Sequence, residues 1–178
     1  MKKTLLLFAA TLIFGCAAAQ VNWHTIDDAA QAKIGTRIYF VDFYTSWCGW
    51  CKKMDRDTFS DPTVQKILNK YYYPVKFDAE SKKNVIWNGR VYPAATSARN
   101  GLHSFTSAIL GRNVGFPTYA FLRANGTLLQ AVPGYFAPND FVVVLWYFAS
   151  GDCDKYPFDR YQQIFDKEIR PSMEKQLK

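Results

Sequence analysis

The sequence predicts one α/β domain. Short runs rich in β-branched and aromatic residues alternate along the chain with stretches of helical periodicity, which is the pattern typical of that class. Hydrophobic residues make up 49% of the 178 residues, which is enough for one substantial core. No internal repeat and no low-complexity linker divides the sequence, so a single domain accounts for it.

The first 19 residues predict a secretory signal peptide. Two lysines precede an apolar stretch at 5–14, and three alanines at 17–19 provide the small residues expected before a cut ahead of Gln20. The apolar stretch is too short to cross a bilayer, and no later segment is long and apolar enough to do so. We therefore expect an exported protein, periplasmic or otherwise outside the cytoplasm, whose domain occupies residues 20–178.

An alternative for the same segment is a lipoprotein signal. Residues 13–16, Ile-Phe-Gly-Cys, are similar to a lipobox in which Cys16 becomes the lipidated N-terminus, although Phe14 is bulky for that motif. The protein would then also be exported, but a lipid anchor would hold it to a membrane.

Export determines which roles are open to the cysteines that remain after the signal peptide is removed. Without the signal peptide three are left, Cys48, Cys51 and Cys153, which is too few for a disulfide framework and enough for one pair and an odd thiol. The formal charge of +7 falls to +5 without the two lysines of the signal peptide, and the remaining basic residues are scattered. That distribution predicts a solvated surface and argues against nucleic-acid binding.

The first elements of the domain are expected to alternate between helix and strand. A short helix at 25–34 is capped by Thr25 and stopped by Gly35. Residues 37–44 are rich in β-branched and aromatic side chains and predict a central buried strand. A helix at 48–59 should follow this strand.

The next helix should begin at Pro62 with Asp61 as its N-cap, because proline suits the first helical position, and a strand at 73–78 should follow. Later, the Asn-Gly pair at 88–89 suits a type I′ hairpin turn. Pro171 is expected to bend or end the last helix. The remaining predicted elements are a hairpin at 85–92, a helix at 102–110, strands at 119–122 and 128–132, a helix at 140–150 and a helix at about 157–177.

The most informative motif is the pair Cys48 and Cys51, placed where the strand gives way to the helix. The first turn of a helix has unsatisfied N–H groups and the positive end of the helix dipole, so a cysteine there is favoured as a thiolate. A thiolate is the attacking species in thiol–disulfide exchange, and a second cysteine one turn later can close a disulfide and release a bound substrate. The pair therefore indicates a redox site.

Other uses of the pair fit the sequence less well. A permanent disulfide between residues three positions apart closes a very small loop and stabilises little. A zinc site needs four ligands, and beyond the pair the mature chain offers Cys153, His24 and His103, none at ligand spacing. Haem attachment requires a histidine where Lys52 stands. We therefore expect no metal, and no cofactor other than the redox-active disulfide.

These residues resemble the thioredoxin superfamily. Residues 41–44, Val-Asp-Phe-Tyr, followed by 47–52, Trp-Cys-Gly-Trp-Cys-Lys, are similar to the strand and active-site helix of thioredoxins. Phe-Pro-Thr at 116–118 resembles the cis-proline loop of that family, and Asn-Gly at 125–126 with Gly134 resembles its closing hairpin. The resemblance implies a thioredoxin-like fold, in which helices flank a central mixed sheet.

A nearer likeness is to the thioredoxin-like domains of exported thiol:disulfide interchange proteins of the Dsb type, in which a segment like 57–64 follows the active-site helix. The core of the match is about 37–150. An insertion at about 84–112, before the cis-proline loop, and the extra helix at about 157–177 depart from the pattern. So does the Gly-Trp dipeptide at 49–50, which replaces Gly-Pro and leaves the redox potential open.

The resemblance assigns chemical roles to three residues. Cys48 is the nucleophile, Cys51 resolves the mixed disulfide, and Asp42 accepts the proton of Cys51. Asp42 is a charged residue in an apolar run, and burial would raise the pKa of its carboxyl group; the alternative is a strand-edge or capping carboxylate. Lys76 either lies beside Asp42 on the neighbouring strand or is an exposed lysine at a sheet edge. Cys153 stands between two aspartates, which disfavour a thiolate, and is expected to be a quiet free thiol.

Four further residues are predicted to contact substrate. Pro117 is expected to follow a cis peptide bond, and its loop to present backbone groups at Phe116 to an extended substrate peptide. Trp47 and Trp50 either form an apolar surface around Cys48 or pack beneath the loop. The insertion either extends this surface or has a small core of its own.

The predicted function is thiol–disulfide exchange outside the cytoplasm. The protein is expected to act on protein substrates that contain disulfides, more as a reductase or isomerase than as an oxidase, and to take electrons from a thiol protein. The alternative is a binding module, either a chaperone for a soft metal ion such as Cu(I) or a docking domain. Asp42 and the loop at 116–118 are unnecessary for carrying an ion and expected for disulfide exchange, which favours the enzyme.

Overall fold

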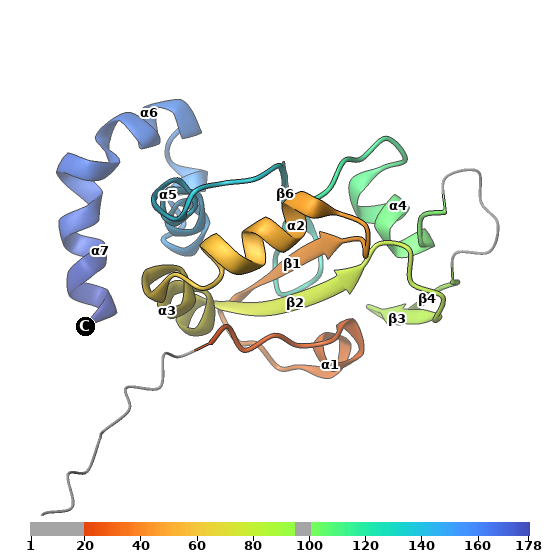
Figure 1. Cartoon of the computed structure of the whole chain (residues 1–178). Coiled ribbons are helices and arrows are strands. Elements are labelled where there is room, and N and C mark those ends of the chain that lie inside the picture. Colours follow the sequence, from red (N-terminus) through yellow and green to blue (C-terminus); the bar gives the residue numbers. More distant parts are fainter. Residues whose placement is uncertain (1–19, 95–100) are drawn as a thin grey trace, which may run out of the picture.

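Figure 1 shows a computed structural model of the chain, which describes residues 20–94 and 101–178. The predicted signal peptide, and with it Cys16, lies outside the described residues. Within those residues no helix has the length and apolar character needed to cross a membrane. In chain order the elements are α1 (Ile26–Gln31), β1 (Ile38–Tyr44), α2 (Gly49–Lys53), the π-helix η1 (Met54–Thr58), α3 (Pro62–Tyr71), β2 (Tyr72–Asp78), β3 (Val85–Trp87), β4 (Arg90–Tyr92), α4 (Ser104–Leu110), β5 (Thr118–Leu122), β6 (Leu128–Pro133), α5 (Pro138–Ala149), the 3₁₀ turn η2 (Asp152–Asp154), α6 (Phe158–Ile164), the π-helix η3 (Phe165–Ile169) and α7 (Arg170–Leu177).

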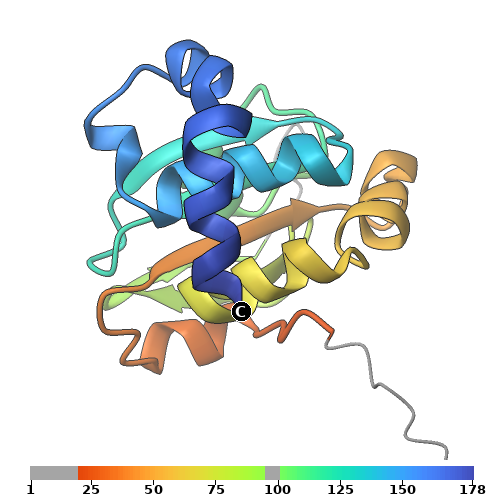
Figure 2. The ribbon, with the colours of Figure 1, turned by 90° about the vertical axis from the view of Figure 1, so that its left-hand side faces the viewer.

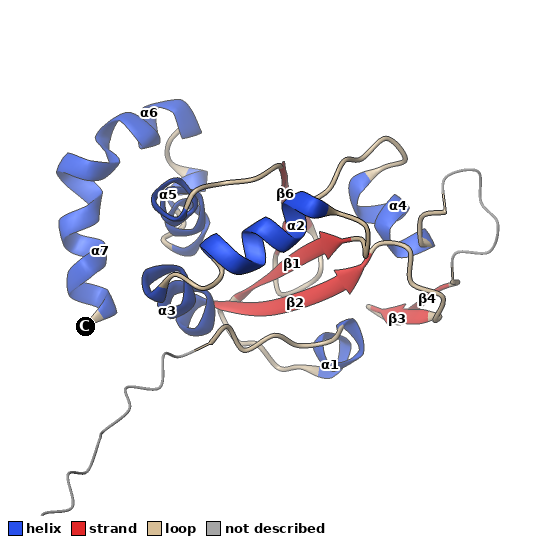
Figure 3. Ribbon diagram, in the orientation of Figure 1, coloured by secondary structure: helices blue, strands red, loops and turns tan. Residues whose placement is uncertain are grey.

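A four-stranded mixed sheet forms the centre of the domain, and helices lie on both of its faces (Figure 3). The strand order is β2-β1-β5-β6; β1 pairs in parallel with β2 and antiparallel with β5, and β5 pairs antiparallel with β6. β1 is therefore internal, and its residues from Tyr39 to Phe43 are all buried, as expected of a strand covered on both faces. The predicted α/β class and central mixed sheet are confirmed, and each of the four strands lies within one residue of its predicted bounds.

Each face of the sheet has its own apolar layer. On the first face, α3, α5 and the C-terminal helices pack over side chains such as Phe40 and Phe121. On the second face, α1, β3 and α4 pack over side chains such as Phe43 and Val75. Figure 2 shows α7 lying across α3 and α5, with Met173 buried in the first layer. The C-terminal helix is thus part of the domain core.

The described parts of the predicted insertion, residues 84–94 and 101–112, pack on the second face of the sheet, and residues 95–100 lie outside the described residues. The Asn-Gly turn of its hairpin, at 88–89, has φ angles of 50° and 73°, which are those of the predicted type I′ turn. Trp87 lies edge-on to Tyr39 with 4.9 Å between ring centroids, and Phe105 of α4 stacks on Phe43 at 5.8 Å. The insertion therefore shares the core of the domain, and the alternative of a separate small core is wrong.

Three helices differ from their predicted bounds by two residues or more, one of them α4, which begins at Ser104 rather than at 102. α1 ends at Gln31 rather than at 34, because the backbone becomes extended at Ala32 and Ile34 enters the core from outside the helix. α5 begins at Pro138, two residues before the predicted start, because proline is suited to the first turn of a helix.

Two further helices contain π-helical segments that local patterns do not predict. The helix expected at 48–59 consists of α2 and η1, and the C-terminal helix is interrupted by η3. Pro171 lies in the first turn of α7 and has no N–H to donate to the preceding turn. The helix continues beyond it to Leu177, and α6 and α7 run in different directions (Figure 1). Of the two predicted effects of Pro171, the structure shows that the C-terminal helix bends and does not end there.

Candidate active site

The predicted cysteine pair lies between the end of β1 and the start of α2. Cys48 is the N-cap of α2 and forms a disulfide with Cys51, with 5.3 Å between the two Cα atoms. The Sγ of Cys48 also accepts a hydrogen bond from the backbone N–H of Cys51 at 3.0 Å. A hydrogen bond to an ionised acceptor is stronger than one to a neutral acceptor, so this N–H favours the Cys48 thiolate once the disulfide is reduced.

The two tryptophans beside the pair are on the surface. Trp47 and Trp50 are 65% and 58% exposed, whereas the cysteines are 3% and 6% exposed. The ring of Trp47 lies edge-on to that of Phe116 with 6.1 Å between centroids, and the ring of Trp50 lies 5.5 Å from that of Tyr135. The tryptophans therefore form an exposed aromatic surface beside the pair, and the alternative in which they pack beneath the loop is wrong.

The loop before β5 lies next to Trp47. The Phe116–Pro117 peptide bond is cis, as the resemblance implies. The indole Nε1 of Trp47 donates a hydrogen bond to Oε2 of Glu80 at 3.1 Å, and a groove of about 400 Å³ lies beside these side chains. Because the C-terminal part of the insertion borders this groove, it extends the surface around the pair. The groove is lined by Trp47, Glu80, Leu102 and residues 112–116.

Asp42 lies in the internal strand β1 and is 2% exposed. Burial raises the pKa of its carboxyl group to about 7; the ammonium of Lys76, 3.6 Å from Oδ2, lowers this pKa, and the charge of Asp55 raises it. Asp42 and Lys76 are partners in the parallel β1–β2 register, which places the lysine beside the carboxylate as one alternative predicted. The strand-edge alternative for Asp42 is wrong, and its role as proton acceptor stays a prediction.

Asp55 belongs to the same cluster and is not among the predicted site residues. It lies on η1, one turn after Cys51, and forms an ion pair with Lys76. The ammonium of Lys76 also faces the rings of Trp23 and Tyr44, at 5.2 Å and 5.4 Å from their centroids. The signal that predicts Asp55 is an acidic residue four positions after Cys51, a spacing that places two residues on one helical face. We call Asp42, Asp55 and Lys76 the inner cluster.

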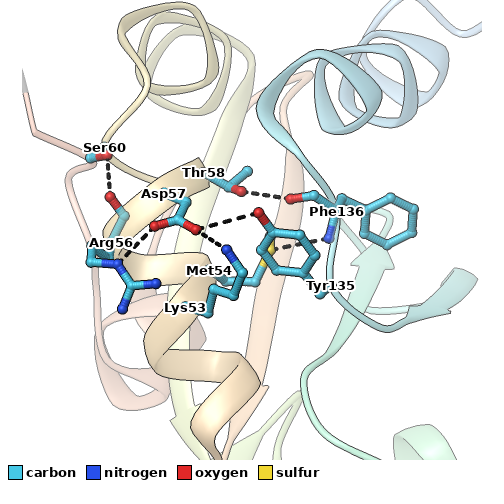
Figure 4. Close-up of polar contacts among 8 residues, drawn as sticks. All are labelled: Lys53, Met54, Arg56, Asp57, Thr58, Ser60, Tyr135 and Phe136. Carbon is cyan, nitrogen blue, oxygen red and sulfur yellow. Dashed lines mark hydrogen bonds and ion pairs between the residues drawn. The ribbon is translucent and has the colours of Figure 1, made fainter.

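Hydrogen bonds hold η1 to the loop that follows β6 (Figure 4). The hydroxyl of Thr58 donates to the carbonyl oxygen of Phe136 at 2.6 Å, and the N–H of Phe136 donates to the Sδ of Met54 at 3.3 Å. These contacts join segments that are 78 and 82 positions apart in the sequence. They fix the helix of the cysteine pair against the end of the sheet.

A second charged group lies on the outer side of the same helix (Figure 4). Asp57 forms ion pairs with Lys53 and Arg56 and accepts a hydrogen bond from the hydroxyl of Tyr135 at 3.4 Å. The Lys53 ammonium lies 4.6 Å from the centroid of the Tyr135 ring. Its hydrogen bond to Asp57 lowers the pKa of that carboxyl group. We call Lys53, Arg56, Asp57 and Tyr135 the outer cluster.

Cys153 lies in η2, after the end of α5. It is a half-buried free thiol that borders a cavity of about 690 Å³ between β6 and α5. Burial and the charge of Asp154 raise the pKa of the thiol, which makes it a poor nucleophile. Among residues 20–94 and 101–178, no group of three or more His, Cys, Asp or Glu residues is arranged to hold a metal ion.

Residues 25–149 match the family model of the thioredoxin-like domain. The chain belongs to the thioredoxin-like domain family. It is 35% identical over 82 residues to the thiol:disulfide interchange protein DsbD of Salmonella typhi, a match that covers 36% of this chain and 14% of DsbD. It is 33% identical over 82 residues to DsbD of Citrobacter koseri, with the same coverage. The chain therefore corresponds to a small part of these curated relatives.

Solved structures show the same fold. The DsbH oxidoreductase superposes with a TM-score of 0.50 at 16% identity, over 84% of this chain and 95% of that chain. A thioredoxin-fold protein from Helicobacter pylori superposes with a TM-score of 0.51 at 15% identity, over 85% and 89% of the two chains. The thioredoxin of Thermus thermophilus has a TM-score of 0.51 at 17% identity, over 72% and 87%. At these identities the likeness shows the fold, and the predicted thioredoxin-like architecture is confirmed.

Proposed function

We propose that this protein is an exported thiol–disulfide oxidoreductase that exchanges disulfides with protein substrates through Cys48 and Cys51. The observation that carries the proposal is a disulfide at the start of α2 with the buried carboxyl group of Asp42 in the strand before it, within a thioredoxin-like domain. The cysteine pair is itself the redox centre, so the reaction requires no metal and no further cofactor.

The first step is attack on the substrate disulfide. The thiolate of reduced Cys48 attacks one sulfur of the substrate, the substrate S–S bond breaks, and the departing sulfur takes a proton from solvent. A mixed disulfide then joins Cys48 to the substrate. The N–H of Cys51, which contacts the Sγ of Cys48, stabilises the thiolate before the attack.

The second step requires a proton acceptor. Asp42 takes the proton of the Cys51 thiol, and the resulting thiolate attacks the Sγ of Cys48. The mixed disulfide breaks, the second substrate sulfur leaves and is protonated, and the Cys48–Cys51 disulfide forms. Two electrons have passed from the pair to the substrate. A carboxyl group with a pKa of about 7 can accept a proton at neutral pH, which an ordinary aspartic acid does weakly.

We propose that the electrons flow towards the substrate, as in a reductase or isomerase. A proton acceptor for the resolving cysteine speeds the step that releases reduced substrate. Each turnover consumes two electrons, so a thiol protein must reduce the pair again. Trp47 and Trp50 present exposed rings beside the pair, and the Phe116–Pro117 loop lies next to Trp47; we propose that an extended peptide binds along these groups.

Export is part of the proposal and is supported by the sequence of residues 1–19. Their basic start, apolar stretch and small residues fit a signal peptide, and the resulting compartment permits a disulfide to persist. We propose a periplasmic or otherwise extracytoplasmic location, with a lipid anchor at Cys16 as the alternative mode of export.

Reduction of insulin disulfides by residues 20–178 tests the proposed function. With dithiothreitol as electron donor we expect turnover that Cys48→Ser abolishes, because a serine hydroxyl does not form the mixed disulfide. Cys153→Ser is the matched control and should retain the rate, because that thiol lies outside the site. Equal rates for Cys48→Ser and the unaltered protein would overturn the proposal. So would stoichiometric copper binding without any turnover, which would favour the soft-metal chaperone.

A further inference from the structure

Tyr119 lies in β5, directly opposite Asp42 in the antiparallel pairing of β1 and β5. Its side chain is wholly buried. Its ring packs against those of Phe40 and Phe141, with 5.5 Å and 5.1 Å between centroids, so the position of the hydroxyl is set by the core. That hydroxyl has no hydrogen-bond partner among the residues that the structure describes. A buried hydroxyl without a protein partner is unusual and requires an explanation.

Asp42 has an acceptor that matches the unpartnered hydroxyl donor of Tyr119, namely its carboxylate oxygen Oδ1. Its Oδ2 lies 3.6 Å from the Lys76 ammonium, whereas its Oδ1 is buried and, within 20–94 and 101–178, has no hydrogen-bond partner. Directly opposed residues of an antiparallel pair have Cβ atoms about 4.5–5.5 Å apart on one face of the sheet. A donor and an acceptor that lack protein partners thus belong to neighbouring side chains. They make no direct hydrogen bond, so a hydrogen-bonded link between them would have to pass through a water.

The hydroxyl of Tyr119 can act only as a donor towards a carboxylate. Burial, together with the charges of Asp42 and Asp55, raises the pKa of Tyr119 above its ordinary value. The phenol therefore keeps its proton at every pH at which the thiol chemistry runs. A permanently protonated hydroxyl beside an ionisable carboxyl group favours the ionised form of that carboxyl group.

We propose that Tyr119 is a positioning residue for Asp42: its hydroxyl, through a bridging water, donates a hydrogen bond to Oδ1 and so sets the pH at which Asp42 accepts the proton of Cys51. Only one part of this inference rests on the proposed function: the acceptance of the Cys51 proton by Asp42. The proton that moves is that of Cys51, and the Tyr119 hydroxyl keeps its own. Asp42 is then held by Lys76 at one oxygen and by Tyr119 at the other.

The charged and titratable groups around Asp42 come from three neighbouring elements and from its own strand. Lys76 of β2 stabilises the carboxylate, and Asp55 of η1 destabilises it. Burial, followed by the charges of Asp78 and Asp42, raises the pKa of Tyr44 of β1, so it too remains a neutral phenol. Against the large effect of burial, Lys76 favours the anion. In the proposal, the Tyr119 hydroxyl of β5 favours it as well. Removal of the hydroxyl should therefore raise the pKa of Asp42 further.

Titration of the Asp42 carboxyl carbon by NMR, in the oxidised protein, tests the proposal. We expect Tyr119→Phe to move the midpoint upward by about one pH unit, as for the loss of one hydrogen bond to a charged group. Tyr161→Phe is the matched control, because Tyr161 is also wholly buried and its hydroxyl likewise lacks a partner among the described residues, while its ring packs near Tyr147 at the other end of the first layer. It should leave the midpoint unchanged. An unchanged midpoint in Tyr119→Phe would overturn the proposal.

The unaltered protein provides a second measurement that does not depend on how Tyr119→Phe folds. If the hydroxyl serves Asp42, its proton should exchange slowly with solvent, and its NMR signal should shift with the same midpoint as the Asp42 carboxyl carbon. A hydroxyl signal that does not follow Asp42 would contradict the proposal.

Neither measurement requires turnover. Failure of insulin reduction would therefore overturn the proposed function without changing the titration result, and an unchanged titration would overturn the role of Tyr119 while turnover persisted. If both the proposed function and the role of Tyr119 are correct, the pH profile of insulin reduction by Tyr119→Phe should move to higher pH together with the titration midpoint of Asp42.

Discussion

The inner and outer clusters place carboxyl groups of the same kind on two sides of one helix, in opposite environments. Asp42 is 2% exposed and has one charged partner at 3.6 Å, and burial raises its pKa to about 7. Asp57 is partly exposed and has ion pairs with Lys53 and Arg56, and the hydrogen bond from Lys53 lowers its pKa. The difference teaches that the partners and the solvent around an aspartate decide whether it can exchange protons at neutral pH. Asp42 is suited to proton transfer, and Asp57 is suited to holding the helix in place.

Removal of the carboxyl group of Asp42 should have the largest effect. We expect Asp42→Asn to slow insulin reduction at neutral pH by about a hundredfold, because a positioned general base contributes on that scale and the amide cannot accept the Cys51 proton. Steady-state rates across the neutral pH range provide the measurement. A rate within twofold of the unaltered protein would show that the inner cluster does not serve as the base.

Asp42→Asn should lower the rate of insulin reduction but raise the free energy of unfolding at high pH. The stability measurement serves as the control for this variant. The folded-state pKa of Asp42, about 7, lies above the ordinary value of 3.8 for an aspartic acid, so the native state binds this proton more tightly than the unfolded state. Protonated Asp42 therefore stabilises the folded protein by up to about 4 kcal/mol. This contribution is fully present below the unfolded pKa and is lost as the pH rises through the folded pKa. Urea unfolding at about pH 5 and about pH 8 should show Asp42→Asn gaining stability relative to the unaltered protein at the higher pH. No such gain would mean that burial of the charge costs nothing.

Removal of the cation that stabilises the Asp42 carboxylate should have an intermediate effect. Lys76→Met keeps the apolar stem and removes the ammonium, so the pKa of Asp42 should rise and the pH profile of insulin reduction should move upward. Each unit of that shift lowers the rate on the acidic limb about tenfold. Lys53→Met is the matched control from the outer cluster and should leave the profile where it is, since Lys53 contacts Asp57 and Tyr135. Equal shifts in the two variants would indicate a general charge effect.

Removal of the carboxylate of the outer cluster should have the smallest effect. We expect Asp57→Asn to keep the rate and the pH profile of insulin reduction and to lower the melting temperature slightly, because ion pairs near solvent contribute little to stability. A shifted pH profile in this variant would remove the distinction between the clusters. Thermal unfolding followed by circular dichroism, together with the rate assay, measures both quantities.

The features that could be predicted from the sequence are those set by neighbours along the chain. The strand at β1, the Asp61–Pro62 start of α3 and the type I′ turn of the insertion each depend on a few consecutive residues, and all three occur where expected. The pair Cys48 and Cys51 and the burial of Asp42 belong to this group, because an apolar run before a helix start already implies them. The same local patterns contain no information on the π-helical segments, which depend on how a helix is held by distant contacts.

What the sequence alone determined is therefore the chemistry available at the end of β1: two cysteines at helix spacing, preceded by a carboxylate in a buried strand. Only the tertiary structure decided which groups surround that carboxylate. β1 lies between β2 and β5, so Lys76 and Tyr119 reach Asp42 from segments 34 and 77 positions away, and η1 brings Asp55 to the same place. The pKa of a buried carboxyl group depends on burial and on charges within a few ångströms. Those neighbours are set by the order of strands in the sheet, which no short stretch of sequence specifies.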